Sequence, residues 1–344
     1  MTTADLRHSF DHTTLQTYLA THVPGFTTLD GITRFTGGQS NPTYRITSGA
    51  RAFVVRAKPT GKLLSSAHQV AREFRVMQAL RDTPVPVPQM YHLTGDESPL
   101  GPQFFVMEAL TGRTFWDPAL PDLTHVDRTA IYHNMVRVMA DLHSVDVAAV
   151  GLSDFGAPGN YFARQVGRWT KQYRAAELKP NADVDWLIDW LAERIPDDDG
   201  QISIVHGDFR LDNLMFAPDG TAVLALLDWE LSTIGHPMAD LAYQIMGMQL
   251  PNQGVARGLG NADRAALGIP TEQDYIAAYC NARGIQPPAN WPFFLTFSYF
   301  RFIAIIQGVI RRAVDGNASN PGDLGQMQAA IPALAQVARR IAKP

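Results

Sequence analysis

The sequence has little that could anchor or cross-link the chain. It has one cysteine, Cys280, in 344 residues, so no disulfide can form within it and a reducing compartment is compatible. No basic stretch followed by an apolar core opens the sequence, which argues against a secretory signal. The most hydrophobic run, residues 293–310, is interrupted by Arg301 and Gln307 and therefore predicts a buried helix, not a membrane span. We expect a cytoplasmic globular protein.

Charged residues are also scarce. They make up 18% of the sequence, and the formal net charge of −4 gives no reason to expect a nucleic acid or a membrane as partner. No internal repeat or low-complexity tract is present. The apolar content of 46% suits an ordinary globular chain, long enough for one large domain or two smaller ones.

The most informative feature is a polar loop that carries His206, Asp208 and Asn213, followed after one more apolar run by Asp228. This spacing fits the catalytic loop and the metal-binding Asp of protein kinases. Asp208 is the candidate carboxylate for the acceptor hydroxyl. Asn213 and Asp228 offer hard oxygen ligands for Mg²⁺ on the phosphates of ATP. A polar turn without chemistry explains each residue alone, but it does not explain the combination.

Residues 206–216 (HGDFRLDNLMF) and 228–233 (DWELST) closely resemble the aminoglycoside phosphotransferase-like branch of the kinase superfamily. Within this branch, the sequence of these motifs most closely resembles that of the kinase-like domain associated with acyl-CoA dehydrogenases. Residues 38–43 and 62–64 resemble the same subgroup, and the resemblance runs from about Phe35 to beyond Arg312.

The resemblance implies an α+β, bilobal protein-kinase-like fold. A small-sheet N-lobe would occupy residues 1–108, and a larger, mostly helical C-lobe residues 109–344. It also implies a small-molecule kinase that uses ATP and Mg²⁺ and transfers a phosphoryl group to a hydroxyl. Family membership by itself says little about the acceptor.

Residues 29–107 predict the small sheet with one main helix. Short runs rich in β-branched and aromatic residues mark its strands, at 32–35, 43–47, 52–56 and 103–107. The first turn contains Gly37, Gly38, Ser40 and Asn41, where glycine lets backbone N–H groups approach phosphate oxygens. A hairpin turn without a ligand is the competing interpretation.

The third predicted strand carries Arg56 where kinases of this type place a lysine on the α- and β-phosphates. Arginine can still clamp phosphate, with different geometry. Lys58 lies two residues on, hence on the same face of a strand, and is the substitute candidate. A solvated basic strand end is the alternative. The next helix, predicted to begin at Ser66, carries Glu73 beside its buried stripe, and the resemblance implies that Glu73 orients the basic residue.

After this sheet, Glu108 and Leu110 resemble the hinge whose backbone would hydrogen-bond adenine. The chain then becomes helical, with amphipathic segments at residues 127–143, 161–174 and 184–194. His143 is expected to be structural. The resemblance implies that Asp240 hydrogen-bonds the catalytic loop, and an N-cap is an equal alternative.

The charges in the C-terminal third of the sequence suggest the chemical class of the acceptor. Residues 241–344 contain nine Lys or Arg and five Asp or Glu, whereas a pocket for polycationic aminoglycosides needs converging carboxylates. We therefore expect a neutral or anionic acceptor, and the resemblance points to a hydroxyacyl-CoA-like one. Its apolar part would face the aromatic residues between Trp291 and Phe300, unless these are helix core.

Two other function classes remain open. An aminoglycoside- or choline-type kinase differs only in the acceptor. A catalytically silent nucleotide-binding module is supported by the departure at Arg56 alone. A metal-dependent hydrolase is disfavoured because the sequence lacks a His pair or three-ligand cluster at suitable spacing.

Overall fold

The computed structural model describes residues 11–35, 41–59, 70–95, 101–253, 256–260, 262–316 and 323–343. The chain divides into two compact units. The sheet unit comprises Met1–Arg113, Met215–Pro218 and Leu224–Ser232, and the helical unit comprises Thr114–Leu214, Asp219–Val223 and Thr233–Pro344. This division differs from a single cut after residue 108. The chain returns to the sheet unit twice, so Asp228 belongs to it.

The sheet unit contains a five-stranded antiparallel sheet in the order β1-β2-β3-β5-β4. Its strands are β1 (Gly31–Arg34), β2 (Thr43–Ser48), β3 (Arg51–Ala57), β4 (Met90–Leu93) and β5 (Phe104–Glu108). Four of them coincide with the predicted runs to within two residues. The edge strand β4 was not predicted.

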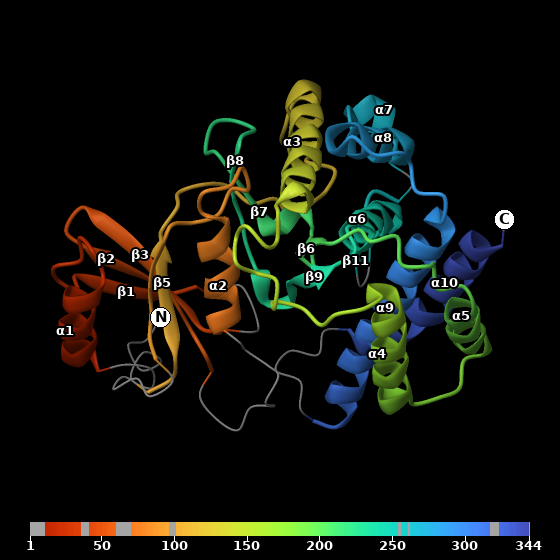
Figure 1. The fold of residues 1–344 in the computed structure, drawn as a ribbon, viewed down its shortest axis with the longest axis horizontal. Helices are drawn as coiled ribbons and strands as arrows, with labels where there is room; N and C mark the ends of the chain where they lie inside the picture. Colours follow the sequence, from red (N-terminus) through yellow and green to blue (C-terminus); the bar gives the residue numbers. More distant parts are fainter. Residues whose placement is uncertain are drawn as a thin grey trace. The chain divides into compact units, whose positions relative to one another are not determined.

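The two faces of this sheet are covered by different helices, α1 (His12–His22) and α2 (Val70–Leu80) (Figure 1). Side chains alternate along β3, and Phe53, Val55 and Ala57 join the α1 residues Leu15 and Leu19 in one buried cluster. On the opposite face Phe105 packs against Phe74 of α2, with ring centroids 6.2 Å apart. Arg56 therefore shares the face of the sheet that α2 covers.

The helical unit is built from eight of the described helices. They are α3 (His125–Ser144), α4 (Tyr161–Ala176), α5 (Ala182–Glu193), α6 (Met238–Gln249), α7 (Arg264–Leu267), α8 (Glu272–Arg283), α9 (Trp291–Val314) and α10 (Leu324–Ala342). The predicted helices coincide with α3, α4 and α5 to within two residues at each end. The side chain of Thr124 caps α3 by accepting from the N–H of Asp127.

Short elements connect the loop residues of interest. Strand β6 (Ser203–Val205) pairs antiparallel with β9 (Thr233–Gly235), and β7 (Leu214–Phe216) pairs with β8 (Val223–Leu226). Two 3₁₀ turns carry key residues, η1 (Leu211–Asn213) and η2 (Trp229–Leu231). A further small pair, β10 (Asn252–Gln253) and β11 (Ala256–Arg257), lies after α6.

Helix α9 is the central core element of the helical unit. It is long and apolar enough to cross a membrane by composition, but 78% of its most apolar window is buried against the protein, including α4, α5, α6 and α10. Of the six aromatic side chains that were candidates to face an acceptor, Trp291 is half-buried and the other five are core. Phe293, Phe294, Phe297, Tyr299 and Phe300 are each 5% exposed or less, because successive positions all meet neighbouring helices.

Candidate active site

The loop between β6 and η1 holds Asp208 in a defined orientation. The side-chain nitrogen of Asn213 donates to both the backbone carbonyl of Asp208, at 2.8 Å, and its carboxylate, at 3.1 Å. The Nε atom of Arg210 lies 3.3 Å from the other carboxylate oxygen, and Arg210 also donates to Asp212 at 2.8 Å. The Asp208 carboxylate remains 21% exposed, so it is both oriented and accessible.

The orientation of Asn213 also suits a cation ligand. Its amide nitrogen faces Asp208, an assignment that follows from the hydrogen-bond network, so the amide oxygen is the end available for a cation. An amide oxygen is a ligand type that Mg²⁺ accepts. The residue therefore fits the metal role that the sequence predicts for it, and the role itself stays a prediction.

Asp240 fixes the backbone of this loop from α6. Its carboxylate accepts the N–H of His206 at 2.7 Å and the N–H of Gly207 at 2.8 Å. Burial raises the pKa of Asp240, but hydrogen bonds from His143 and from the Gly207 N–H outweigh it, and the pKa lies below its usual range. The predicted contact with the loop is present. The alternative of an N-cap is wrong, because Asp240 lies inside α6, where Pro237 takes the cap position.

His143 and His206 are both structural in this arrangement. His143 is buried, its Nε2 donates to Asp240 at 3.2 Å, and its Nδ1 accepts from the Tyr279 hydroxyl at 2.7 Å. Burial lowers the pKa of His143, so the neutral ring with this tautomer satisfies both contacts. His206 is fully buried and its Nδ1 accepts the N–H of Asp208 at 3.2 Å. Neither ring is placed to act as the base.

The sheet unit assembles a second cluster of site residues around Arg56. Its Nε lies 2.9 Å from the carboxylate of Glu73 on α2, and its Nη2 donates to the carboxylate of Asp228 at 3.0 Å. The carboxylate of Glu230 is 3.9 Å from the same Nη2. The contact expected between Arg56 and Glu73 is therefore present, and Arg56 additionally holds the candidate metal ligand Asp228.

Glu73 is held in an unusual electrostatic environment. Burial raises its pKa to about 7, opposed by the guanidinium of Arg56 and reinforced by the charges of Asp228 and Glu230. An ion pair at 2.9 Å alone would lower the pKa. The pKa nevertheless rises, because the carboxylate is 2% exposed and two further carboxylates lie near it.

The cluster around Arg56 also includes a hydrogen bond from Asn41 and a left-handed backbone conformation at Asp228. The Asn41 side chain donates to Glu73 at 2.8 Å, so in this conformation its amide braces Glu73. Asp228 adopts the left-handed region with φ of 64°, a conformation that Asp tolerates better than most residues, at the start of η2. Gly37, Gly38 and Ser40 lie outside the described residues.

The remaining nucleotide-binding candidates, Lys58, Glu108 and Leu110, lie at or just after the ends of strands β3 and β5. Lys58 follows β3, and its backbone N–H donates to the carbonyl of Gln103. Glu108 ends β5, and its N–H donates to the carbonyl of Gln89, so a contact of Glu108 with adenine would use its own carbonyl. Leu110 follows two residues later at a half-buried position. The adenine and phosphate roles of these residues stay predictions.

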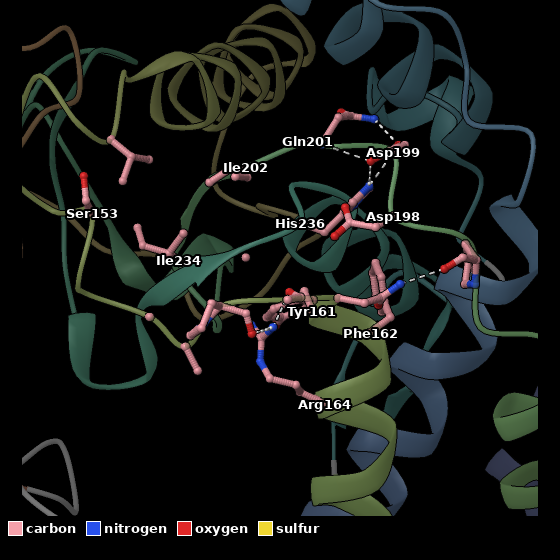
Figure 2. A pocket seen from close by; sticks show the side chains of 18 of the residues that line it. Ser153, Tyr161, Phe162, Arg164, Asp198, Asp199, Gln201, Ile202, Ile234 and His236 are labelled. Carbon is pink, nitrogen blue, oxygen red and sulfur yellow. Dashed lines mark hydrogen bonds and ion pairs between the residues drawn. The ribbon is translucent and has the colours of Figure 1, made fainter.

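A large cavity lies within the helical unit. It has a volume of about 900 Å³ and is lined by residues after α3, at the start of α4, before β6 and at β9. Figure 2 shows Asp198, Asp199 and His236 on one side, and Tyr161 and Arg164 on another. His236 donates from Nε2 to Asp199 at 3.3 Å while its Nδ1 accepts the N–H of Met238. The sequence did not indicate this cavity.

Comparison with known proteins identifies the class to which this arrangement belongs. Residues 31–280 match the model of the phosphotransferase enzyme family, and the chain belongs to that family. Among solved structures, a Ralstonia eutropha protein provisionally described as an aminoglycoside phosphotransferase is 44% identical, with a TM-score of 0.89 over 97% of this chain and 98% of the other. The predicted α+β, bilobal kinase-like fold is therefore confirmed.

Two further comparisons show which members of the phosphotransferase family the chain resembles. The chain is 48% identical over 288 residues to acyl-CoA dehydrogenase family member 10 of Mus musculus, and 41% identical over 320 residues to family member 11 of Homo sapiens. These matches cover 83% and 91% of this chain but 27% and 41% of the relatives, so the chain spans less than half the length of either. The predicted resemblance to the kinase-like domain of this group is confirmed.

A more distant structure shares the fold alone. Spectinomycin phosphotransferase, solved with ADP and spectinomycin, is 12% identical with a TM-score of 0.63, and the alignment covers 96% of this chain and 98% of that one. The family and these neighbours together indicate small-molecule phosphotransfer.

Proposed function

We propose that the protein is an ATP- and Mg²⁺-dependent kinase that transfers the γ-phosphoryl group to a hydroxyl of a small molecule. The observation that carries this proposal is the orientation of Asp208. Its carboxylate is fixed by Asn213 and its loop by Asp240, yet it remains accessible to an acceptor. In such transfers positioning and charge stabilisation supply most of the catalysis.

Each residue takes a role that its surroundings support. Asp208 orients the acceptor hydroxyl and receives its proton. Asn213 and Asp228 would hold Mg²⁺, which would supply charge neutralisation on the phosphates. Arg56, braced by Glu73, binds phosphate oxygens, with Lys58 as the substitute. The loop with Gly37, Gly38, Ser40 and Asn41 would cover the nucleotide, and Glu108 and Leu110 would contact adenine.

For the acceptor, we propose a neutral or anionic molecule of the hydroxyacyl-CoA type. Its support is the similarity to members 10 and 11 of the acyl-CoA dehydrogenase family. The surplus of bases after residue 241 is a weaker argument than the sequence suggested. Arg264, Arg311 and Arg339 pair with Glu272, Asp315 and Asp183.

A second candidate is an acceptor that carries amines, such as an aminoglycoside. The cavity of the helical unit supports it, because five aspartates line that cavity and Arg164 is its one lining Lys or Arg among the described residues. The aspartates are Asp146, Asp154, Asp197, Asp198 and Asp199. A cationic ligand would be favoured there by charge.

One experiment separates these acceptors. Purified protein is incubated with Mg·ATP and either a panel of hydroxyacyl thioesters, a panel of aminoglycosides or a metabolite extract, and phosphorylated products are identified by mass spectrometry. We expect product from the thioesters, its loss when EDTA removes the metal, and none from Asp228→Ala. Product from aminoglycosides alone would replace the anionic acceptor by the cationic one.

The role of Asp208 has its own test. We expect Asp208→Asn to reduce kcat by about 10²- to 10⁴-fold while KM for ATP changes by less than about threefold, because the carboxylate acts on the acceptor. Steady-state kinetics with the best acceptor measures both. Wild-type kcat in this variant would exclude Asp208 from the chemistry, and wild-type protein without any ATP-dependent transfer would overturn the proposed function.

A further inference from the structure

The residue that follows Asp240 by one helical turn on α6 is Tyr243. Residues three apart on a helix lie on the same face, so the face that reaches the catalytic loop through Asp240 also carries Tyr243 toward it. Tyr243 is 7% exposed. Asp240 accepts the N–H groups of His206 and Gly207, and the next residue of the loop is Asp208.

Arg301 locates the Tyr243 ring beside this loop. The guanidinium of Arg301, on α9, donates to the carbonyl oxygen of Gly207, the residue before Asp208. The same guanidinium lies 4.8 Å from the centroid of the Tyr243 ring and 5.5 Å from that of Trp169. Arg301 is 6% exposed, so its charge is compensated in this place by the carbonyl and the two aromatic rings.

The Tyr243 ring, placed beside the loop by Arg301, brings its hydroxyl within the electrostatic influence of the Asp208 carboxylate. Burial raises the pKa of Tyr243, and the charge of Asp208 and its hydrogen bond with the hydroxyl raise it further. The hydroxyl thus stays protonated and donates. Asn213 and Arg210 orient the carboxylate from within the loop, and Tyr243 is the candidate donor from outside it.

We propose that Tyr243 is a positioning residue for Asp208, held in place by Arg301. This inference rests on the proposed function of Asp208. Tyr243 fixes the side-chain torsion of the carboxylate so that one oxygen faces the acceptor hydroxyl. Fixing a catalytic group in advance lowers the entropy cost of reaching the transition state.

The test is a double-mutant cycle on kcat with Tyr243→Phe and Asp208→Asn. We expect Tyr243→Phe to lower kcat about tenfold, the effect of one hydrogen bond to a charged group, with KM for ATP within about twofold. In the Asp208→Asn background we expect no further loss beyond about twofold, because Tyr243 acts through that carboxylate. Equal losses in both backgrounds would overturn the inference.

A matched control separates positioning from general stability. Tyr132 is also a buried tyrosine, and its hydroxyl donates to the carbonyl of Pro118 at 2.7 Å. We expect Tyr132→Phe and Tyr243→Phe to lower the melting temperature by similar amounts, and Tyr132→Phe to leave kcat within about twofold. An equal loss of kcat in both variants would show a structural effect only.

A crystal structure of Tyr243→Phe decides the question without turnover. We expect the Asp208 carboxylate to occupy more than one rotamer in the variant and a single rotamer in the wild type. If the wild type transfers phosphate to no acceptor, the proposed function fails, and this structure still decides whether Tyr243 positions Asp208. A single unchanged rotamer in the variant would overturn the positioning role alone.

Discussion

Arg56 joins two carboxylates that come from distant parts of the sequence, binding Glu73 through Nε and Asp228 through Nη2. The guanidinium can do this because its nitrogens point in different directions within one plane, whereas a lysine ammonium is a single point charge. The arginine that departs from the usual kinase lysine therefore has a geometric role in this protein. Arg56, on strand β3, thereby connects helix α2, which carries Glu73, with the start of the η2 turn, which follows Asp228.

Replacing Arg56 by methionine should cost stability and nucleotide affinity together. Breaking fully buried ion pairs costs about 3–5 kcal/mol; here we expect about 2 kcal/mol, because Arg56 is 17% exposed and Glu73 can take up a proton. Urea unfolding measures the loss of stability, and calorimetric titration with ADP measures the loss of nucleotide affinity. Lys58→Met is the matched control, expected within about 0.5 kcal/mol. If it weakens ADP binding more than Arg56→Met does, Lys58 is the phosphate ligand.

The pH dependence of folding should carry the signature of Glu73. Its pKa rises from 4.5 in the unfolded chain to about 7 in the folded one, so the folded state binds the extra proton between these values. Stability contributed by this group is present at low pH and is lost as pH rises through about 7. We expect the difference in unfolding free energy between wild type and Glu73→Gln to change by about 3 kcal/mol from pH 4.5 to 7.5. Parallel curves would show that Glu73 titrates normally.

Asp240→Asn should loosen the catalytic loop. The two carboxylate oxygens of Asp240 now accept from two backbone N–H groups and from His143, whereas an asparagine side chain has one acceptor oxygen. The side-chain NH₂ group of the asparagine would face one of these donors. We expect a stability loss of about 3 kcal/mol and at least about a tenfold fall in kcat. Denaturant unfolding and kinetics measure these. Asp183→Asn, whose partner Arg339 is partly exposed, is the control and should cost about 1 kcal/mol or less.

Gly235→Ala should destabilise the helical unit. A Cβ atom at Gly235 in β9 would lie 2.5 Å from two carbons of the ring of Tyr161, the first residue of α4. We expect a loss of about 1–3 kcal/mol from this overpacking. Gly167→Ala, in α4 with open space around it, should instead gain up to about 1 kcal/mol through helix propensity. Differential scanning calorimetry compares the two, and a stable Gly235→Ala protein would contradict the tight packing of Tyr161.

The parts of the site that the sequence predicted are those encoded over short distances. The spacing of Asp208 and Asn213 is a property of one loop, and the strand period places Arg56 and α2 on one face of the sheet. Helices α3, α4 and α5 were predicted to within two residues at each end from their apolar spacing, whereas α10 was not predicted although its apolar positions also form a stripe. Helix α1 was missed because its apolar positions do not form a wide stripe, and it is recognisable only from the sheet that it covers.

The parts that were missed depend on long-range packing. No local pattern links Tyr243 or Arg301 to Asp208, because they come from α6 and α9 and meet the loop only in the folded unit. The one available signal was a charged residue, Arg301, within the most apolar run of the sequence. The return of residues 224–232 to the sheet unit was missed for the same reason, since it follows from contacts and not from composition.

Helix α9 supports the core of the helical unit and, through Arg301, also holds the carbonyl of Gly207. A substitution along this helix that reshapes a binding surface would therefore also disturb the loop on which turnover depends. Divergence toward new acceptors is consequently easier in the segments between helices, such as residues 145–160 and 196–202, which carry no part of that support. We expect natural and laboratory variants with altered acceptor preference to differ there first, while α9 keeps its side chains.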